Sequence, residues 1–228
     1  MAKDFAEGTN MSVHTLGEFG DLSLTVVVTS PPWYENCFIV RHRPSGDTVV
    51  VDPGGDFDRI LAALSDQKAS PRAIWLTHGH PDHLGAARPL EKAFGLATLA
   101  HADETPVIAR ASDLNRTFTG EAQEGPAEIR PFTGEPTLDL AGQAVRVIHT
   151  PGHTPGGVCY DFGAFVLTGD TLFRQGVGRT DLPGGSEEKL WASITRLLGL
   201  LPDQALLFSG HGPEWTAADA RRWWKMMA

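Results

Sequence analysis

Residues 77–83 read Thr77-His78-Gly79-His80-Pro81-Asp82-His83 and place four metal-capable side chains within six positions. A helix would scatter side chains at this spacing around its axis, whereas a tight turn lets them converge. A lone histidine is usually structural or simply exposed, but that explanation does not account for four metal-capable side chains in one short stretch. Because imidazole nitrogen and carboxylate oxygen are common ligands of Zn²⁺, the stretch predicts a metal site on a loop.

The segments that flank this loop have the patterns of regular structure. Ala73 to Thr77 is typical of a strand, and Leu84 to Phe94 is typical of a helix, so the loop is predicted at a strand-to-helix turn. Upstream, Asp56 to Gln67 carries apolar residues at helical spacing, with Asp56 as the expected N-cap. These helices are expected to cover one face of a sheet.

Three further candidate ligands lie at the ends of predicted strands in the second half of the chain: His153, Asp170 and His211. Each is preceded by glycine, which lets the backbone turn sharply and lets a neighbouring side chain approach closely. Taken one at a time, each is better explained as an ordinary polar turn than as a metal ligand. Together with the histidine-rich loop, they extend the predicted metal site to seven side chains.

The order of the remaining elements indicates an α/β fold. Strands are expected at 22–29, 37–41 and 48–51, and again at 145–149, 157–161, 165–168 and 205–208, with a helix at 186–200. Residues 103–136 are rich in glycine and proline and favour a helix followed by a long loop. Two such halves predict two packed sheets with helices outside, in a single domain over residues 1–228.

Composition narrows the class of function. The formal charge of −9 and the absence of a basic run argue against nucleic acid as a partner. The first 20 residues lack the apolar core of an export signal, and no stretch is long and apolar enough to span a bilayer. Cys37 and Cys159 lack the close spacing of a redox or zinc-ribbon motif. A cytoplasmic protein with two buried free thiols and no membrane contact is expected.

The His-x-His-x-Asp-His motif, followed in order by His153, Asp170 and His211, resembles the metal signature of the metallo-β-lactamase superfamily. Val-Asp-Pro-Gly-Gly around Asp52 is similar too, and the likeness spans roughly residues 36–213. The resemblance implies a four-layer αββα sandwich and two divalent metal ions, zinc in preference to iron or manganese. It also implies the ligands: His78, His80 and His153 for the first metal, Asp82, His83 and His211 for the second, and Asp170 as the bridge. Asp52 would orient a ligand imidazole, although a turn cap explains it nearly as well.

Within that superfamily, Gly-Asp-Thr-Leu-Phe at 169–173 and Gly-Arg-Thr-Asp-Leu-Pro-Gly-Gly at 178–185 resemble glyoxalase II, the hydroxyacylglutathione hydrolases. Only 17 residues follow His211, so the chain resembles the short type without a helical C-terminal domain. The resemblance implies hydrolysis of a small-molecule thioester such as S-lactoylglutathione by a metal-bound hydroxide, with Asp82 and Asp170 as the catalytic carboxylates.

Candidate substrate contacts are fewer. Arg174 and Arg179 follow Asp170 closely, and a guanidinium could bind a substrate carboxylate, but an ion pair from Arg179 to Asp181 explains that residue slightly better. Trp33 and Tyr34 are candidates for an apolar wall at the mouth of the cleft, or for plain core.

Other activities stay open on the same ligands. A persulfide dioxygenase of this fold has a similar Gly-Arg-Thr-Asp segment but uses one iron, so the number of bound metals separates it from a thioesterase. A lactonase or β-lactamase is a further alternative. A binding module without catalysis would be expected to lose ligands, and a nuclease would be expected to have a less acidic chain. The sequence leaves the oligomeric state open.

Overall fold

Seven strands from the first half of the chain form one mixed sheet in the computed structural model, which describes residues 13–227. Residues 1–12, which hold most of the stretch examined for an export signal, and residue 228 lie outside the described part. The strands in sheet order are β1 (Val13–Phe19), β2 (Leu22–Val28), β3 (Asn36–His42), β4 (Asp47–Val51), β5 (Ser70–Trp75), β6 (Thr98–His101) and β7 (Ile129–Phe132). The pairs from β1 to β4 are antiparallel, and those from β4 to β7 are parallel.

The second half of the chain forms a second mixed sheet. Its strands in sheet order are β15 (Trp215–Thr216), β14 (Leu206–Ser209), β11 (Phe165–Gly169), β10 (Val158–Asp161), β9 (Gln143–His149) and β8 (Thr137–Leu140). Only the β11–β14 pair is parallel. Two very short strands, β12 (Leu172–Phe173) and β13 (Gly176–Val177), pair with each other beside this sheet.

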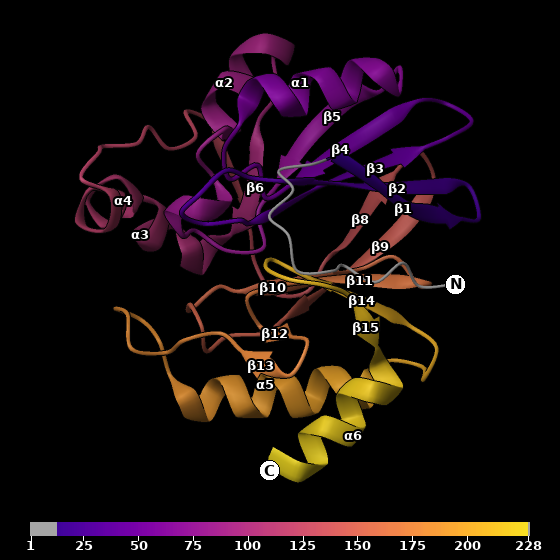
Figure 1. The fold of residues 1–228 in the computed structure, drawn as a ribbon, viewed down its shortest axis with the longest axis vertical. Helices are drawn as coiled ribbons and strands as arrows, with labels where there is room; N and C mark the ends of the chain where they lie inside the picture. Colours follow the sequence, from indigo (N-terminus) through magenta and orange to yellow (C-terminus); the bar gives the residue numbers. More distant parts are fainter. Residues whose placement is uncertain (1–12, 228) are drawn as a thin grey trace.

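Helices cover the outer faces of both sheets (Figure 1). α1 (Phe57–Asp66) and α2 (Ala87–Phe94) lie on the first sheet, and α5 (Glu187–Leu200) and α6 (Ala217–Met227) lie on the second. Alternation along the strands explains the layers, since Val26 and Phe38 face the core between the sheets while Val27 faces the helices. The expected four-layer αββα sandwich is confirmed.

The short elements differ from the sequence expectation. The helix expected from Leu84 begins only at Ala87, and a 3₁₀ turn, η1 (Pro81–His83), precedes it. Asp56 makes no side-chain cap to α1, because its carboxylate accepts a hydrogen bond from the Ser30 hydroxyl at 2.8 Å. Residues 103–136 contain more regular structure than expected: η2 (Ala102–Glu104), α3 (Thr105–Ile108), α4 (Ala111–Thr119) and strand β7.

Both cysteines are buried and unpaired with each other, as expected. Burial raises the pKa of the Cys159 thiol to about 11, so this group stays protonated and unreactive near neutral pH. Within residues 13–227, no helix has the length and apolar character needed to cross a bilayer.

Candidate metal centre

The predicted ligands come from four loops and meet at one edge of the sandwich. His78, His80, Asp82 and His83 lie between β5 and α2, on a loop that is continuous in sequence. The other three are separated by whole strands: His153 follows β9, Asp170 follows β11, and His211 follows β14. Tertiary structure therefore brings all seven candidate residues of the sequence motif to one place.

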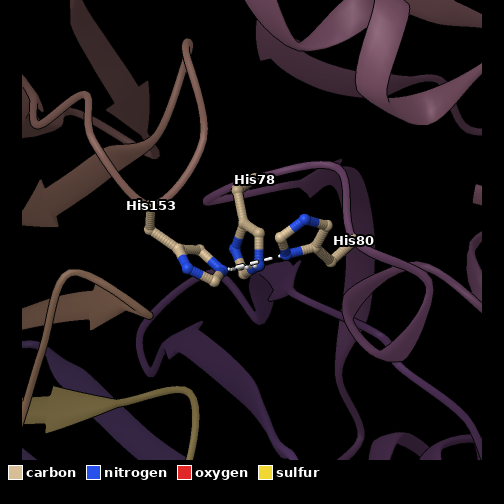
Figure 2. A group of neighbouring side chains, drawn as sticks. All are labelled: His78, His80 and His153. Carbon is tan, nitrogen blue, oxygen red and sulfur yellow. Dashed lines mark hydrogen bonds between the residues drawn. The ribbon is translucent and has the colours of Figure 1, made fainter. Parts of the chain in front are cut away.

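His78, His80 and His153 form the first group. Their rings turn toward one another from two separate loops (Figure 2). His153 Nε2 lies 2.9 Å from His80 Nδ1 and 3.3 Å from His78 Nε2. All three side chains are buried, and their nitrogens are close enough together to bind a single ion.

Asp82, His83 and His211 form the second group, and Asp170 lies between the two groups. Asp82 Oδ2 is 3.3 Å from His211 Nε2. One oxygen of Asp170, Oδ2, is 3.7 Å from His153 Nε2 and 3.6 Å from His211 Nε2. A carboxylate in this position contacts both groups, which is the arrangement that a bridging ligand requires.

Unsatisfied atoms show that these residues suit metal ions. His83 Nε2 and Asp170 Oδ1 are buried 3.4 Å apart, and neither has a hydrogen-bond partner among the described residues. Buried polar atoms normally have a partner, and a divalent cation would satisfy both of these. The backbone leaves them little room, because a Cβ atom on Gly210 would lie 2.4 Å from Asp170 Oδ1 and 2.6 Å from His83 Cε1. The clusters are thus suited to a dinuclear metal site.

The electrostatics of the first group favour metal binding. Burial, and then the nearby His153, lowers the pKa of His80 to about 3, and burial also holds the pKa of His78 well below its usual value. Both imidazoles are therefore neutral near pH 7, and their lone pairs are free to bind a cation.

In the second group, the pKa of the histidine His83 shifts upward instead of downward. Burial acts to lower the pKa of His83, but the carboxylates of Asp170 and Asp82 outweigh it and raise this pKa well above its usual value. Burial likewise acts to raise the pKa of Asp170, and the positive charge of His83 outweighs it. Without a metal, His83 thus takes the place of a cation between two ionised carboxylates.

Asp52 orients an imidazole in each group. Its carboxylate accepts a hydrogen bond from His83 Nδ1 at 3.1 Å and another from the Thr77 hydroxyl at 2.6 Å. The Thr77 oxygen is then free to accept from His78 Nδ1 at 3.1 Å. Each contact places a ring proton on Nδ1 and leaves Nε2 of His83 or His78 facing the centre. The sequence indicated Asp52 but not the link through Thr77.

Glu104 connects the two loops of the first group, and the sequence analysis missed it. Its side chain is fully buried and accepts backbone hydrogen bonds from Gly79 and Gly156, each at 2.6 Å. Gly79 lies between His78 and His80, and Gly156 lies in the loop that carries His153. One carboxylate thus fixes the spacing between ligands of both halves of the chain.

The four candidate substrate contacts are partly or fully exposed, and none of them lines the cavity beside His80. Arg179 binds Asp181 through two hydrogen bonds of 2.7 Å, as the alternative interpretation expected, and its backbone oxygen accepts from His153 Nδ1 at 2.7 Å. Trp33 packs edge-on against Phe118, with ring centroids 5.6 Å apart. The last two, Tyr34 and Arg174, are exposed.

Two buried groups outside the sequence motif lie near the centre. His101 stacks on His149, with centroids 4.3 Å apart and planes at 14°, so the in-plane lone pairs of the two rings do not converge. Glu35 is fully buried, and neither of its carboxyl oxygens has a hydrogen-bond partner within residues 13–227. Burial raises the pKa of Glu35 well above its usual value.

Residues 30–211 match the Metallo-beta-lactamase superfamily domain, and the chain belongs to this superfamily. The probable metallo-hydrolase YqgX of Bacillus subtilis is 37% identical over 171 residues, which cover 73% of this chain and 80% of that protein. Hydroxyacylglutathione hydrolase GloC of Haemophilus influenzae is 29% identical over 206 residues, which cover 86% and 94%.

Two solved structures share the fold closely. The B3 metallo-beta-lactamase BLEG-1 superposes with a TM-score of 0.80 at 33% identity, covering 87% of this chain and 96% of that one. The protein TTHA1623, solved in a di-iron-bound form, superposes with a TM-score of 0.78 at 38% identity, covering 86% and 96%. The chain is thus a metallo-hydrolase by family, with metal-binding clusters of the dinuclear kind.

Proposed function

We propose that the protein is a dinuclear metal-dependent thioesterase of the glyoxalase II type, acting on S-lactoylglutathione or a related small-molecule thioester. The observation that carries this proposal is the complete second group, Asp82, His83 and His211, beside the histidine triad. A hydrolase that activates water between two cations needs both groups, whereas a single-iron dioxygenase needs only one. Zinc is the proposed metal because imidazole predominates among the ligands.

Residues of the chain would hold the two cations and keep the ligand rings in position. His78, His80 and His153 would hold one cation, Asp82, His83 and His211 the other, and Asp170 would contact both. When bound, two cations supply a hydroxide near neutral pH and positive charge for the oxyanion of the attacked carbonyl. Asp52 and Thr77 keep the rings of His83 and His78 oriented, and the backbone oxygen of Arg179 does the same for His153.

The leaving group favours a thioester over an amide. A thiol has a pKa near about 8.5 and departs as the thiolate, so the site needs no strong general acid to protonate it. The GloC relative is named as a hydroxyacylglutathione hydrolase, which supports this substrate class. A cytoplasmic location, where thiols stay reduced, is part of the proposal and fits the two free cysteines.

Metal content and turnover test the proposal together. The purified, zinc-loaded protein should contain about two equivalents of metal per chain, as a site with two cations requires. It should hydrolyse S-lactoylglutathione without oxygen and consume no oxygen with glutathione persulfide. His211→Ala should lose one equivalent and most of the activity, while His42→Ala, at a half-buried histidine that ends β3, should lose neither. One tightly held iron with oxygen uptake would overturn the hydrolase assignment, and two metals without thioester turnover would overturn the substrate class.

A further inference from the structure

A cavity of about 700 Å³ opens beside the first group of ligands. One wall is the helical segment from η2 through α4, and the other is the loop at 182–184. Its lining includes His80, Pro106, Val107, Arg110, Leu114 and Leu182. Because His80 belongs to both the cavity and the histidine triad, a molecule that fills this cavity reaches the metal centre.

The cavity has the character of a small-molecule site. Pockets for such ligands have volumes of about 300 to 1,000 Å³ and are mostly apolar, with a few polar groups that fix orientation. Val107 in α3, Arg110 directly before α4 and Leu114 in α4 all line this wall of the cavity. The lining is thus mostly apolar and holds a single guanidinium, that of Arg110.

Arg110 has its charge available for a ligand. Within residues 13–227 it forms no ion pair, whereas the neighbouring Asp113 is 3.7 Å from Arg116 and Asp103 is 3.7 Å from His101 Nδ1. Arg179 differs, because Asp181 binds one edge of its guanidinium through two hydrogen bonds. Among the side chains that line this cavity, the cation free to meet a substrate anion is therefore Arg110.

The balance of charge in the lining selects the kind of anion. Arg110 is accompanied there by two carboxylates, Asp103 and Asp113. A phosphate carries close to two negative charges near neutral pH and would be repelled by these carboxylates more strongly than a single carboxylate. A guanidinium binds a carboxylate through two parallel hydrogen bonds, so a carboxylate suits the cavity better than a phosphate.

We propose that this cavity binds the non-reacting arm of the substrate and that Arg110 binds a carboxylate on that arm. The inference rests on the proposed thioesterase function and assigns its substrate class, a thioester with a partly apolar arm that ends in a carboxylate. Arg110 thereby takes the anchoring role for which the sequence offered Arg174 and Arg179 as candidates.

Paired substrates test this assignment on the zinc-loaded protein. One is S-lactoylglutathione, and the other is the same thioester with its carboxylates blocked as methyl esters. Arg110→Ala should raise KM for the free acid roughly 10- to 100-fold, as expected for loss of a charged hydrogen bond, and far more than for the blocked ester. The KM of Arg110→Lys for the free acid should lie between that of the wild-type protein and that of Arg110→Ala. Arg116→Ala, within α4 but outside the cavity lining, is the matched control and should leave both KM values unchanged.

Equal effects of Arg110→Ala on the two substrates, or a selective effect of Arg179→Ala in its place, would overturn the assignment. A coenzyme A thioester preferred over both glutathione substrates would also overturn it, because its arm carries phosphates.

Direct binding keeps this test separate from that of the proposed function. Calorimetry with S-methylglutathione, a thioether that cannot be hydrolysed, and with its dimethyl ester measures the cavity without turnover. Tighter binding of the free acid, lost in Arg110→Ala, supports the assignment even if no thioester is hydrolysed. Equal binding of the two probes to both proteins contradicts it even if thioesters are hydrolysed.

Discussion

At the scale of single residues, the centre depends on side chains that set the direction of lone pairs as much as on the ligands themselves. Asp52 is 1% exposed and has three hydrogen-bond donors around it: the Thr77 amide, the Thr77 hydroxyl and His83. Through these contacts it fixes one ring in each metal group. Its backbone has a positive φ of 51°, a conformation that asparagine also tolerates.

Asp52→Asn should therefore weaken metal retention by roughly 10- to 100-fold without unfolding the chain, as losses of such supporting contacts commonly do. An amide places a donor where the carboxylate accepts, so His83 or Thr77 loses its partner. Competition with a chromophoric chelator measures the loss, and Asp58→Asn on the exposed side of α1 is the control. Unchanged metal affinity would mean that Asp52 only caps its own turn and does not support the metal ligands.

His83 makes metal uptake dependent on pH. Its raised pKa means that the metal-free protein holds a proton on His83 at a pH where a free imidazole has lost it. The metal must displace that proton, so apparent affinity at the second group should rise with pH and fall as the solution becomes acidic. Zinc titrations at two pH values on either side of neutrality, with proton release followed by a pH indicator, check the sign. Affinity independent of pH would contradict it.

At the scale of elements, the sequence predicted most of the long apolar strands and the helices α1, α2 and α5 within a few residues. It missed the strand β1, the helix α6 and the short strands β6, β7 and β8, and it read residues 103–136 largely as loop. Short segments carry too little periodicity to be distinguished from loops. Their pairing partners, such as Glu128 to Thr98, lie far away in the sequence and decide the structure.

Glu104 lies in the segment 103–136 and shows how such a segment can support the candidate metal centre. Glu104→Gln should lower the free energy of unfolding by about 1 to 3 kcal/mol, because an amide nitrogen would face one of the two backbone N–H donors. It should also weaken binding of the first metal equivalent, since the loops of His80 and His153 lose their connection. Chemical denaturation of the metal-free protein and chelator competition give the two readouts, with Glu188→Gln as the exposed control. Lower stability with unchanged metal affinity would leave Glu104 a purely structural role.

At the scale of the whole molecule, the metal centre joins two halves that each form one sheet. The first sheet supplies four of the candidate ligands through a single loop, and the second supplies His153, Asp170 and His211 through three loops. The core between the sheets adds direct contacts, among them Trp75 against Tyr160, whose hydroxyl donates to the Leu76 backbone oxygen at 2.8 Å.

Removal of the metal should therefore destabilise the whole fold and not only the site. A ligand that binds only the folded state adds about 2.7 kcal/mol when its free concentration is 100 times its Kd. A chelator should thus lower the midpoint of thermal unfolding of the zinc-loaded protein, and excess zinc should restore it. His153→Ala should show a smaller shift, because one sheet then contributes fewer ligands. An unchanged midpoint in the wild-type protein would mean that the metal does not link the halves.

The sequence by itself determined which side chains form the candidate metal centre, because six neighbouring positions hold four of its candidate ligands and glycines precede the other three. Local spacing and turn-forming residues can be recognised in the sequence without knowledge of which segments pack together. Tertiary structure alone decided the rest: Glu104 binds amides 25 and 52 positions away, and Arg110 meets the loop at 182–184 across a cavity. Such contacts depend on how separate elements pack, and no short stretch of sequence encodes that packing.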